Sequence, residues 1–393
     1  MPLEGSAVAP ISLGGGELTV SEPIQDARSY HRPRYRALVA DIALGVAALS
    51  LLAFSAAGDG LYRTVDALPW WAAAPLLAFL AVGLSALVRL PVALWRDAVH
   101  ERRFGLSTQT VAGFAGDRLK TLVVGGTLAA GSVLGLTATV HAAPSAWLAL
   151  AAPGAALLVV GLSFVAPVLL EPIFNRFHPL ADTELAEALR TFASRAGVPV
   201  RDVLVADASR RTRKVNAYVS GLGSTRRVVL FDTLVERATL HELEIVVAHE
   251  LGHRRYRHVA QETVLAMSGA AGLAVALWGL VHWDGLLAAL GASGPGDPRI
   301  APFLLLLATV AGLAAAPFQS ALSRHWEYEC DRFALEQVGD LAAFESAFAL
   351  LSKVNLADPA PPRPLYLWLF THPTVPERLE AARRVARSAT VPA

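Results

Sequence analysis

Six long apolar segments constrain the fold of this chain more than any other feature of its sequence. A helix needs about 20 apolar residues to cross the hydrocarbon core of a bilayer. The segments that meet this length are residues 37–58, 67–88, 119–141, 147–170, 262–283 and 300–323. Hydrophobic residues make up 54% of the 393 residues and charged residues only 17%. We therefore predict an α-helical polytopic membrane protein that is surrounded by a lipid bilayer.

Basic residues collect on one side of these segments. The loops 58–66 and 284–299 carry one arginine each, whereas the stretch between the second and third segments, with the edge of the third, includes Arg96, Arg102, Arg103, Arg118 and Lys120. Four arginines precede the first segment. Because cytoplasmic loops carry the excess of arginine and lysine, and because six spans return the chain to its starting side, both termini are predicted to be cytoplasmic.

The rest of the domain organisation follows from these spans. Residues 1–33 contain three successive glycines and are predicted to be a disordered tail. A four-span region covers residues 34–170, and two further spans lie within 262–323. The polar stretches 171–261 and 324–393 then lie on the same cytoplasmic side, where they can meet as one soluble domain.

Charge and cysteine content exclude several classes of protein. The formal net charge of +1 gives no basic field, so nucleic acid is not predicted as a partner. The single cysteine, Cys330, excludes an internal disulfide framework. The scarcity of lysine relative to arginine is typical of a GC-rich bacterial genome, and we expect the chain in the inner membrane of a bacterium.

The segment 182–230 combines helical and strand patterns. "TELAEALRTFASRAGV" has helical periodicity and ends at Gly197, and "DVLVAD" alternates as a strand does. "KVNAYVSGLGSTRRVVLFD" predicts two strands joined by a glycine-rich turn. Thr239 and Glu242 have the spacing of a capping box and predict the start of a helix over 240–258.

The sequence "HELGH" on that helix has the spacing of a metal site. His249 and His253 are four residues apart, so their side chains lie on one face and can share a metal ion. Glu250 is close enough to accept a proton from a metal-bound water without being a ligand. The alternative is a solvated basic face at the membrane surface, and we interpret His241 and His258 as surface residues.

A hydrolytic zinc site takes three protein ligands and leaves a fourth position for water. The segment "SRHWEYECDRFA", just after the last span, offers Glu327, Glu329 and Asp331 on a predicted helix. Glu327 and Asp331 share a face, so one can bind the metal while the other orients a histidine ring. Spacing alone leaves open which residue has which role, and an amphipathic helix beside the membrane is the simpler alternative.

Taken together, these segments resemble the type I CAAX prenyl protease family of integral-membrane zinc endopeptidases. "HELGH" is followed about 70 residues later by "EYECDRFA" and then by "THPTVPERLEA". The resemblance extends to "ERRFGLSTQTVAGFAGDRLK", "EPIFNRFHPLADTELAEAL" and "NAYVSGLGSTRRVVLFDTLVE", and covers about residues 90 to 385. It implies an α+β zincin-like metalloprotease domain that caps a chamber enclosed by the membrane helices.

The resemblance also implies roles for individual residues. The implied zinc ligands are His249, His253 and Glu327, with Glu250 as general base and Asp331 behind a ligand histidine. Asn216 and Ala217 would lie on an edge strand that pairs with the substrate backbone, and His372 and Arg378 would face the substrate. The chemistry is independent of the resemblance, because an unpaired strand edge can bind an extended peptide and His372 can donate to a developing oxyanion. Without the resemblance, His372 is equally well explained as a loop residue beside a helix cap formed by Thr374 and Glu377.

The expected substrate is a peptide or a membrane-associated protein, prenylated in the eukaryotic members of the family. A quality-control protease with unprenylated substrates is the first alternative, and a non-catalytic metal-binding scaffold or transporter is the second. A transporter is expected to place ionisable residues at mid-span, and apart from Asp41 and His141 the apolar segments have almost none. Asp41 is either functional or a residue whose side chain reaches the interface.

Overall fold

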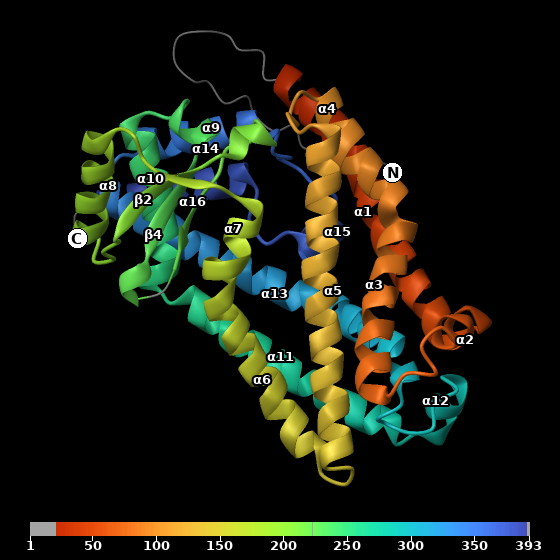
Figure 1. Ribbon diagram of the computed structural model, residues 1–393. Helices are drawn as coiled ribbons and strands as arrows, with labels where there is room; N and C mark the ends of the chain where they lie inside the picture. Colours follow the sequence, from red (N-terminus) through yellow and green to blue (C-terminus); the bar gives the residue numbers. More distant parts are fainter. Residues whose placement is uncertain (1–20, 222, 391–393) are drawn as a thin grey trace, which may run out of the picture.

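Six helical segments of the structure are long and apolar enough to cross a membrane. Residues 21–221 and 223–390 are described in a computed structural model of the chain (Figure 1). The spans in this part of the chain are Ala27–Phe54, Trp70–Arg103, Val111–Ala142, Trp147–Phe174, His258–Val281 and Pro298–Val338. Each overlaps one of the apolar segments predicted from the sequence, so the predicted count and order of the spans are confirmed.

The membrane helices and their short connections follow one another with few irregular residues. The long helices are α1 (Ser21–Phe54), α3 (Trp70–Leu94), α5 (Val111–Ala142), α6 (Trp147–Val165), α11 (His258–Val281) and α13 (Ala301–Val338). The short ones are α2 (Ala56–Tyr62), α4 (Glu101–Arg103), α7 (Glu171–Phe174) and α12 (Asp284–Ala289). One π-helical turn continues α3 into α4 and another continues α6 into α7, so both spans extend toward the polar domain.

The predicted disordered tail is too long. Residues 1–20 lie outside the described part of the chain, but α1 already begins at Ser21. Tyr30 is only 1% exposed, and its hydroxyl donates to Glu101 over 2.5 Å, while the Lys214 ammonium donates to the Tyr30 oxygen over 2.9 Å. Burial of this aromatic ring holds in place residues that were predicted to belong to the tail.

The buried carboxylate of Asp41 is held in an ion pair. It is bidentate to Arg89, with Nε and Nη2 at 3.0 and 2.6 Å, and Arg96 lies 3.6 Å away. The aspartate is 6% exposed and therefore needs this compensation in an apolar span. The pairing joins α1 to α3, which favours a structural function for Asp41.

The polar domain is built on a four-stranded sheet. Its strands are β1 (Phe177–Pro179), β2 (Asp202–Ala206), β3 (Ala217–Ser220) and β4 (Arg227–Phe231), in the order β1-β2-β4-β3. The predicted strand in "DVLVAD" is β2, and the predicted hairpin is the antiparallel pair β3 and β4, so both are confirmed. β2 and β4 are parallel, and β3 is left at the sheet edge with β4 as its only partner among the described strands.

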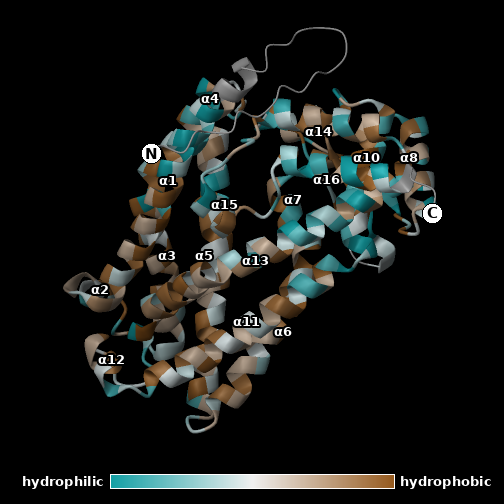
Figure 2. Cartoon of the chain, turned by 180° about the vertical axis from the view of Figure 1, so that it is seen from behind, coloured by the Kyte–Doolittle hydropathy of each residue, from teal (hydrophilic) through white to brown (hydrophobic). Residues whose placement is uncertain are grey.

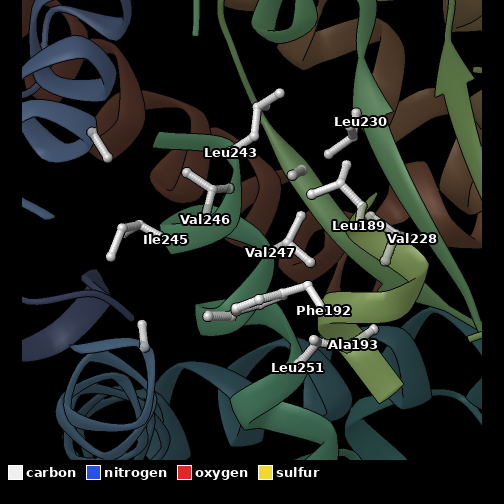
Figure 3. Close-up of a cluster of buried hydrophobic side chains, with 14 of the residues drawn as sticks. Leu189, Phe192, Ala193, Val228, Leu230, Leu243, Ile245, Val246, Val247 and Leu251 are labelled. Atoms are coloured by element: carbon white, nitrogen blue, oxygen red, sulfur yellow. The ribbon is translucent and has the colours of Figure 1, made fainter. Parts of the chain in front are cut away.

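Six helices complete this domain. They are α8 (Thr183–Arg195), α9 (Asp232–Val235), α10 (Leu240–Arg255), α14 (Leu341–Asn355), α15 (Arg363–Leu369) and α16 (Val375–Thr390). Apolar side chains of α8, β4 and α10 interdigitate in one cluster (Figure 3). Leu189, Leu230 and Leu251 are each 0% exposed, and full burial of such a side chain contributes about 1.5–3 kcal/mol. This packing fixes α10 against the sheet.

The two polar stretches of the sequence do meet. Ser346 of α14 donates to Glu242 of α10 over 2.5 Å, and the Asn355 side chain bonds the backbone N–H and C=O of Val215 at 2.9 and 3.0 Å. Polar residues gather in this domain and apolar residues cover the membrane helices (Figure 2). No break separates the last span from the C-terminal stretch, because α13 runs on to Val338 and ends at Gly339, which has φ +71°.

Candidate metal centre

The helix that carries "HELGH" is fixed at both of its ends. Thr239 and Glu242 form the predicted capping box, in which Glu242 accepts from the Thr239 N–H over 2.7 Å. The helix ends at Arg255. Two residues later, Arg257 adopts a left-handed conformation with φ +59°. The predicted continuation to residue 258 is therefore wrong, because the chain turns here into α11.

α10 and α13 bring three metal-ligand side chains together. His249 Nε2 lies 3.3 Å from Glu327 Oε2, and His253 Nε2 lies 3.4 Å from Glu327 Oε1. The helices can approach this closely because a Cβ on Gly252 would lie only 3.1 Å from Cys330 Cα. His249 and Glu327 are buried, at 7% and 2% exposure.

The three side chains fit a tetrahedral metal ion. Two ligand atoms that each lie about 2.0–2.1 Å from such an ion are about 3.3–3.4 Å apart, and each histidine Nε2 lies at this distance from one of the two Glu327 oxygens. Oε2 of Glu327 is buried and accepts no hydrogen bond from any residue that the structure describes, so it has a free coordinating lone pair. Nitrogen and oxygen donors of this kind suit a divalent transition metal.

Asp331 lies behind the first histidine. Its Oδ1 is 3.0 Å from His249 Nδ1, on the side of the ring away from Glu327. A carboxylate in this position holds the imidazole with Nε2 free to bind a metal. The structure therefore assigns different positions to the two acidic residues that spacing could not distinguish: Glu327 between the histidines and Asp331 behind one of them.

Arg378, which the resemblance implied to face the substrate, contacts both buried carboxylates of the cluster. It is 8% exposed, and its guanidinium donates to both oxygens of Asp331, at 2.8 Å from Nε and 2.5 Å from Nη2. Its Nη1 lies 3.3 Å from Glu327. The two buried carboxylates outnumber the one guanidinium, which favours a cation in this pocket.

The pKa values of two residues on α10 agree with a cation site. Burial alone would lower the pKa of His249, but the Glu327 and Asp331 carboxylates together outweigh burial and raise this pKa to about 10, so the pocket attracts positive charge. Desolvation raises the pKa of Glu250, while His249 and His253 act in the opposite direction. A glutamate with a raised pKa is suited to take up a proton and release it again.

His372 reaches the cluster from the loop before α16. Its Nε2 lies 3.3 Å from Glu327 Oε1, and its side chain is 63% exposed, so the ring borders the centre on the accessible side. Thr374 and Glu377 also form the cap that the simpler interpretation predicted, with Glu377 accepting from the Thr374 N–H over 2.8 Å. The two interpretations are compatible, because the cap fixes the loop that carries His372.

The strand edge nearest α10 is partly occupied by side chains. The Asn216 carbonyl accepts from Phe231 N over 3.0 Å, so the next residue, Ala217, directs its N–H and C=O away from β4. Asn216 Oδ1 accepts that N–H over 2.9 Å. Arg254, next to His253 in the sequence, donates to the Val219 carbonyl and ties α10 to the same edge.

Sequence reasoning missed one histidine of this region. His258 was interpreted as a surface residue, but it is 1% exposed and contacts His253, with the two Nδ1 atoms 3.2 Å apart. Glu329, left open as a metal ligand, bonds His258 over 3.1 Å instead of joining the cluster. No spacing rule reveals these contacts, because they depend on the left-handed turn at Arg257. His241 is exposed, as predicted.

An integral-membrane fold and a polar α+β domain with this HExxH centre define a membrane-embedded metallopeptidase. A family model described as "Peptidase family M48" matches residues 179–386. A second, described as "CAAX prenyl protease N-terminal, five membrane helices", matches residues 18–176. The chain belongs to peptidase family M48, which confirms the resemblance. Within 18–176 the described structure has four spans rather than five.

Relatives and a solved structure agree with this assignment. "CAAX prenyl protease 1" of Saccharomyces cerevisiae is 30% identical over 330 residues, which are 78% of this chain and 71% of that protein. "Uncharacterized metalloprotease YhfN" of Bacillus subtilis is 28% identical over 310 residues, 77% of this chain and 71% of that protein. The crystal structure of S. mikatae Ste24p shares the fold with a TM-score of 0.74 at 24% identity, covering 92% of this chain and 88% of that one.

Proposed function

We propose that this chain is a zinc-dependent endopeptidase whose metal is held by His249, His253 and Glu327. The observation that carries the proposal is the separation of 3.3 and 3.4 Å between the histidine Nε2 atoms and Glu327, which suits one tetrahedral ion. Two imidazoles and one carboxylate form a donor set that zinc shares with cobalt and manganese, and the HExxH arrangement favours zinc.

Glu250 is the proposed general base. Zinc in this position supplies Lewis-acid polarisation of the scissile carbonyl and lowers the pKa of water. Glu250 removes a proton from the attacking water and then delivers it to the leaving amine, for which its raised pKa is suited. Asp331 keeps the His249 ring in the tautomer that leaves Nε2 without a proton.

The free edge of β3 is the proposed site for the substrate backbone. An extended peptide that adds beside Ala217 would exchange main-chain hydrogen bonds with it as an additional antiparallel strand. The Asn216 side chain now holds the Ala217 N–H, so it must release that group to the substrate, and its amide is then available for a second contact. His372, on the accessible side of the centre, is placed to donate to the oxygen that gains charge.

The proposed substrates are peptides and membrane-associated proteins, and prenylation is not required of them. Relatives of this chain carry the name CAAX prenyl protease, which describes their substrates. In a bacterium we propose cleavage of unprenylated membrane-bound or misfolded proteins. The excess of arginine in the loops on the protease side supports placing this domain and both termini in the cytoplasm, with the spans in the inner membrane.

A metal-replacement experiment tests the proposal. The detergent-purified chain is stripped with a chelator, reloaded with zinc, cobalt or manganese, and assayed on a quenched fluorescent peptide with and without a farnesyl thioether. His249→Ala is expected to lose both metal and cleavage. His241→Ala removes a histidine of the same helix whose side chain is 69% exposed, and it is expected to keep both. Cleavage that survives removal of metal, or loss of metal in both variants alike, would contradict the assignment.

A further inference from the structure

A second histidine stands behind His253. His258 Nδ1 lies 3.2 Å from His253 Nδ1, on the opposite side of the His253 ring from the Nε2 atom that faces Glu327. His258 Nε2 lies 3.1 Å from Glu329 Oε2. The three side chains form a continuous row from Glu329 to the metal centre.

The backbone and the neighbouring rings hold His258 in this place. Arg257 has φ +59°, a left-handed conformation that is strained for a non-glycine residue and persists only where the surroundings enforce it. The His258 ring stacks on Trp326, with centroids 4.9 Å apart, and on Tyr256 at 5.8 Å. The turn at Arg257 therefore places the buried His258 ring behind His253. A regular helix would instead carry His258 away from it.

One assignment of protons satisfies every contact in the row. A histidine that binds metal through Nε2 carries its proton on Nδ1. His253 Nδ1 must then donate to His258 Nδ1, which has to be an acceptor, so the His258 proton is on Nε2. The Glu329 carboxylate accepts from that Nε2–H. Any other pair of neutral tautomers leaves two donors or two acceptors facing each other.

We propose that His258 and Glu329 are positioning residues that hold His253 in its metal-binding tautomer and orientation. The two ligand histidines are then supported in different ways: Asp331 contacts His249 directly, whereas Glu329 acts on His253 through His258. This inference rests on the proposed function, because it assumes a metal at His253 Nε2.

The same neighbourhood offers a competing arrangement. Donor atoms of His253, His258 and Cys330 lie within 4.8 Å of one another and could hold an ion of their own. Cys330 Sγ is 3.7 Å from His258 Nδ1. Such an ion would need His253 Nδ1 without its proton, so it is incompatible with the hydrogen bond to His258.

Zinc affinity of the full-length protein separates these arrangements. The detergent-purified chain is titrated with zinc against a chromophoric chelator, and its cobalt form is examined by visible absorption. His258→Leu removes both ring contacts and is expected to weaken zinc binding about 10-fold to 100-fold and to shift the cobalt bands. His258→Gln is expected to recover most of the affinity, because its amide oxygen can accept from His253 while its amide N–H donates to Glu329. Cys330→Ala is the matched control and is expected to bind zinc as the wild type does.

Two further readouts keep a folding defect apart from the proposed role. Glu329→Ala acts from the far end of the row on a side chain that is 31% exposed, and it is expected to weaken zinc binding in the same direction as His258→Leu but less. Without metal, the thermal midpoints of the variants are expected to lie close to that of the wild type. With zinc bound, the difference in midpoint between each variant and the wild type is expected to be larger. Full zinc affinity in His258→Leu, no recovery in His258→Gln, or two metal ions per chain of which Cys330→Ala loses one would each overturn the inference. A wild-type chain that binds no zinc would overturn the proposed function as well.

Discussion

Asp331 offers the sharpest test of how the buried charges stabilise this centre. It is 3% exposed and accepts hydrogen bonds from Arg378 Nε at 2.8 Å and Arg378 Nη2 at 2.5 Å, besides its contact with His249. Asp331→Asn keeps the shape but replaces one acceptor oxygen with an amide N–H and removes the charge. Arg378 then stays buried with Glu327 as its remaining carboxylate.

The expected loss of stability is about 3–5 kcal/mol, which is the usual cost of leaving one partner of a buried ion pair uncompensated. The matched control is Glu345→Gln, which breaks a pair made by another arginine of α16: Arg383 Nε donates to Glu345 of α14 over 2.6 Å. Those side chains are 33% and 23% exposed, so water compensates the change and the expected loss is about 1 kcal/mol or less.

The assay is unfolding of the metal-free chains in one detergent, compared at one heating rate because such transitions can be irreversible. Zinc affinity is then measured on the folded variants. Asp331→Asn is expected to bind zinc about 10-fold to 100-fold more weakly, and Glu345→Gln as the wild type does. Equal destabilisation by the two variants would refute the reasoning that the buried pair differs from the exposed one.

Three other substitutions test separate parts of the fold. Burial raises the pKa of Glu242, but hydrogen bonds from Ser346 and Thr239 outweigh burial and lower it, so the contribution of Glu242 to the free energy of unfolding, about 1 kcal/mol, is complete above pH ~4.3 and is lost as the pH falls through the lowered folded-state pKa. The difference in thermal midpoint between wild type and Glu242→Gln should therefore narrow from pH 7 to pH 4, and a difference that widens would contradict this. Gly252→Ala gains helix propensity of about 1 kcal/mol but places a Cβ 3.1 Å from the backbone of α13, so it should destabilise the chain and weaken zinc binding, whereas Gly312→Ala, with open space around it, should do neither. Asp41→Ala leaves Arg89 without its bidentate partner and should lower the thermal midpoint more than the double substitution Asp41→Ala with Arg89→Leu does. A double variant that unfolds at a lower temperature than the single one would show that the unpaired arginine is not the source of the lost stability.

The sequence predicted those features that depend on local patterns. Six spans, the strands at "DVLVAD" and "AYVS", and the capping box at Thr239 and Glu242 are all present in the structure. Each arises from a period, a length or a fixed spacing within one element. The two histidines of "HELGH" belong to this class as well, because four residues on a helix determine that they share a face.

Features that depend on how elements cross could not be predicted in the same way. Glu327 and Asp331 share a face of α13, and which one lies between the histidines depends on where α13 crosses α10, at the contact of Gly252 with Cys330. The burial of Arg378 depends in turn on the docking of α16 against α13 and α14. The surface prediction for His258 was wrong because it assumed a straight helix, which Arg257 ends.

Zinc content and peptide cleavage, measured together on the wild type and on Glu250→Gln, test most directly whether this centre is a zinc peptidase with Glu250 as its base. About one zinc per chain is expected in both proteins, with cleavage reduced about 10²-fold to 10⁴-fold in the variant, because the substitution removes the base and leaves the three ligands in place. Wild-type cleavage by Glu250→Gln, or absence of zinc from both proteins, would contradict it.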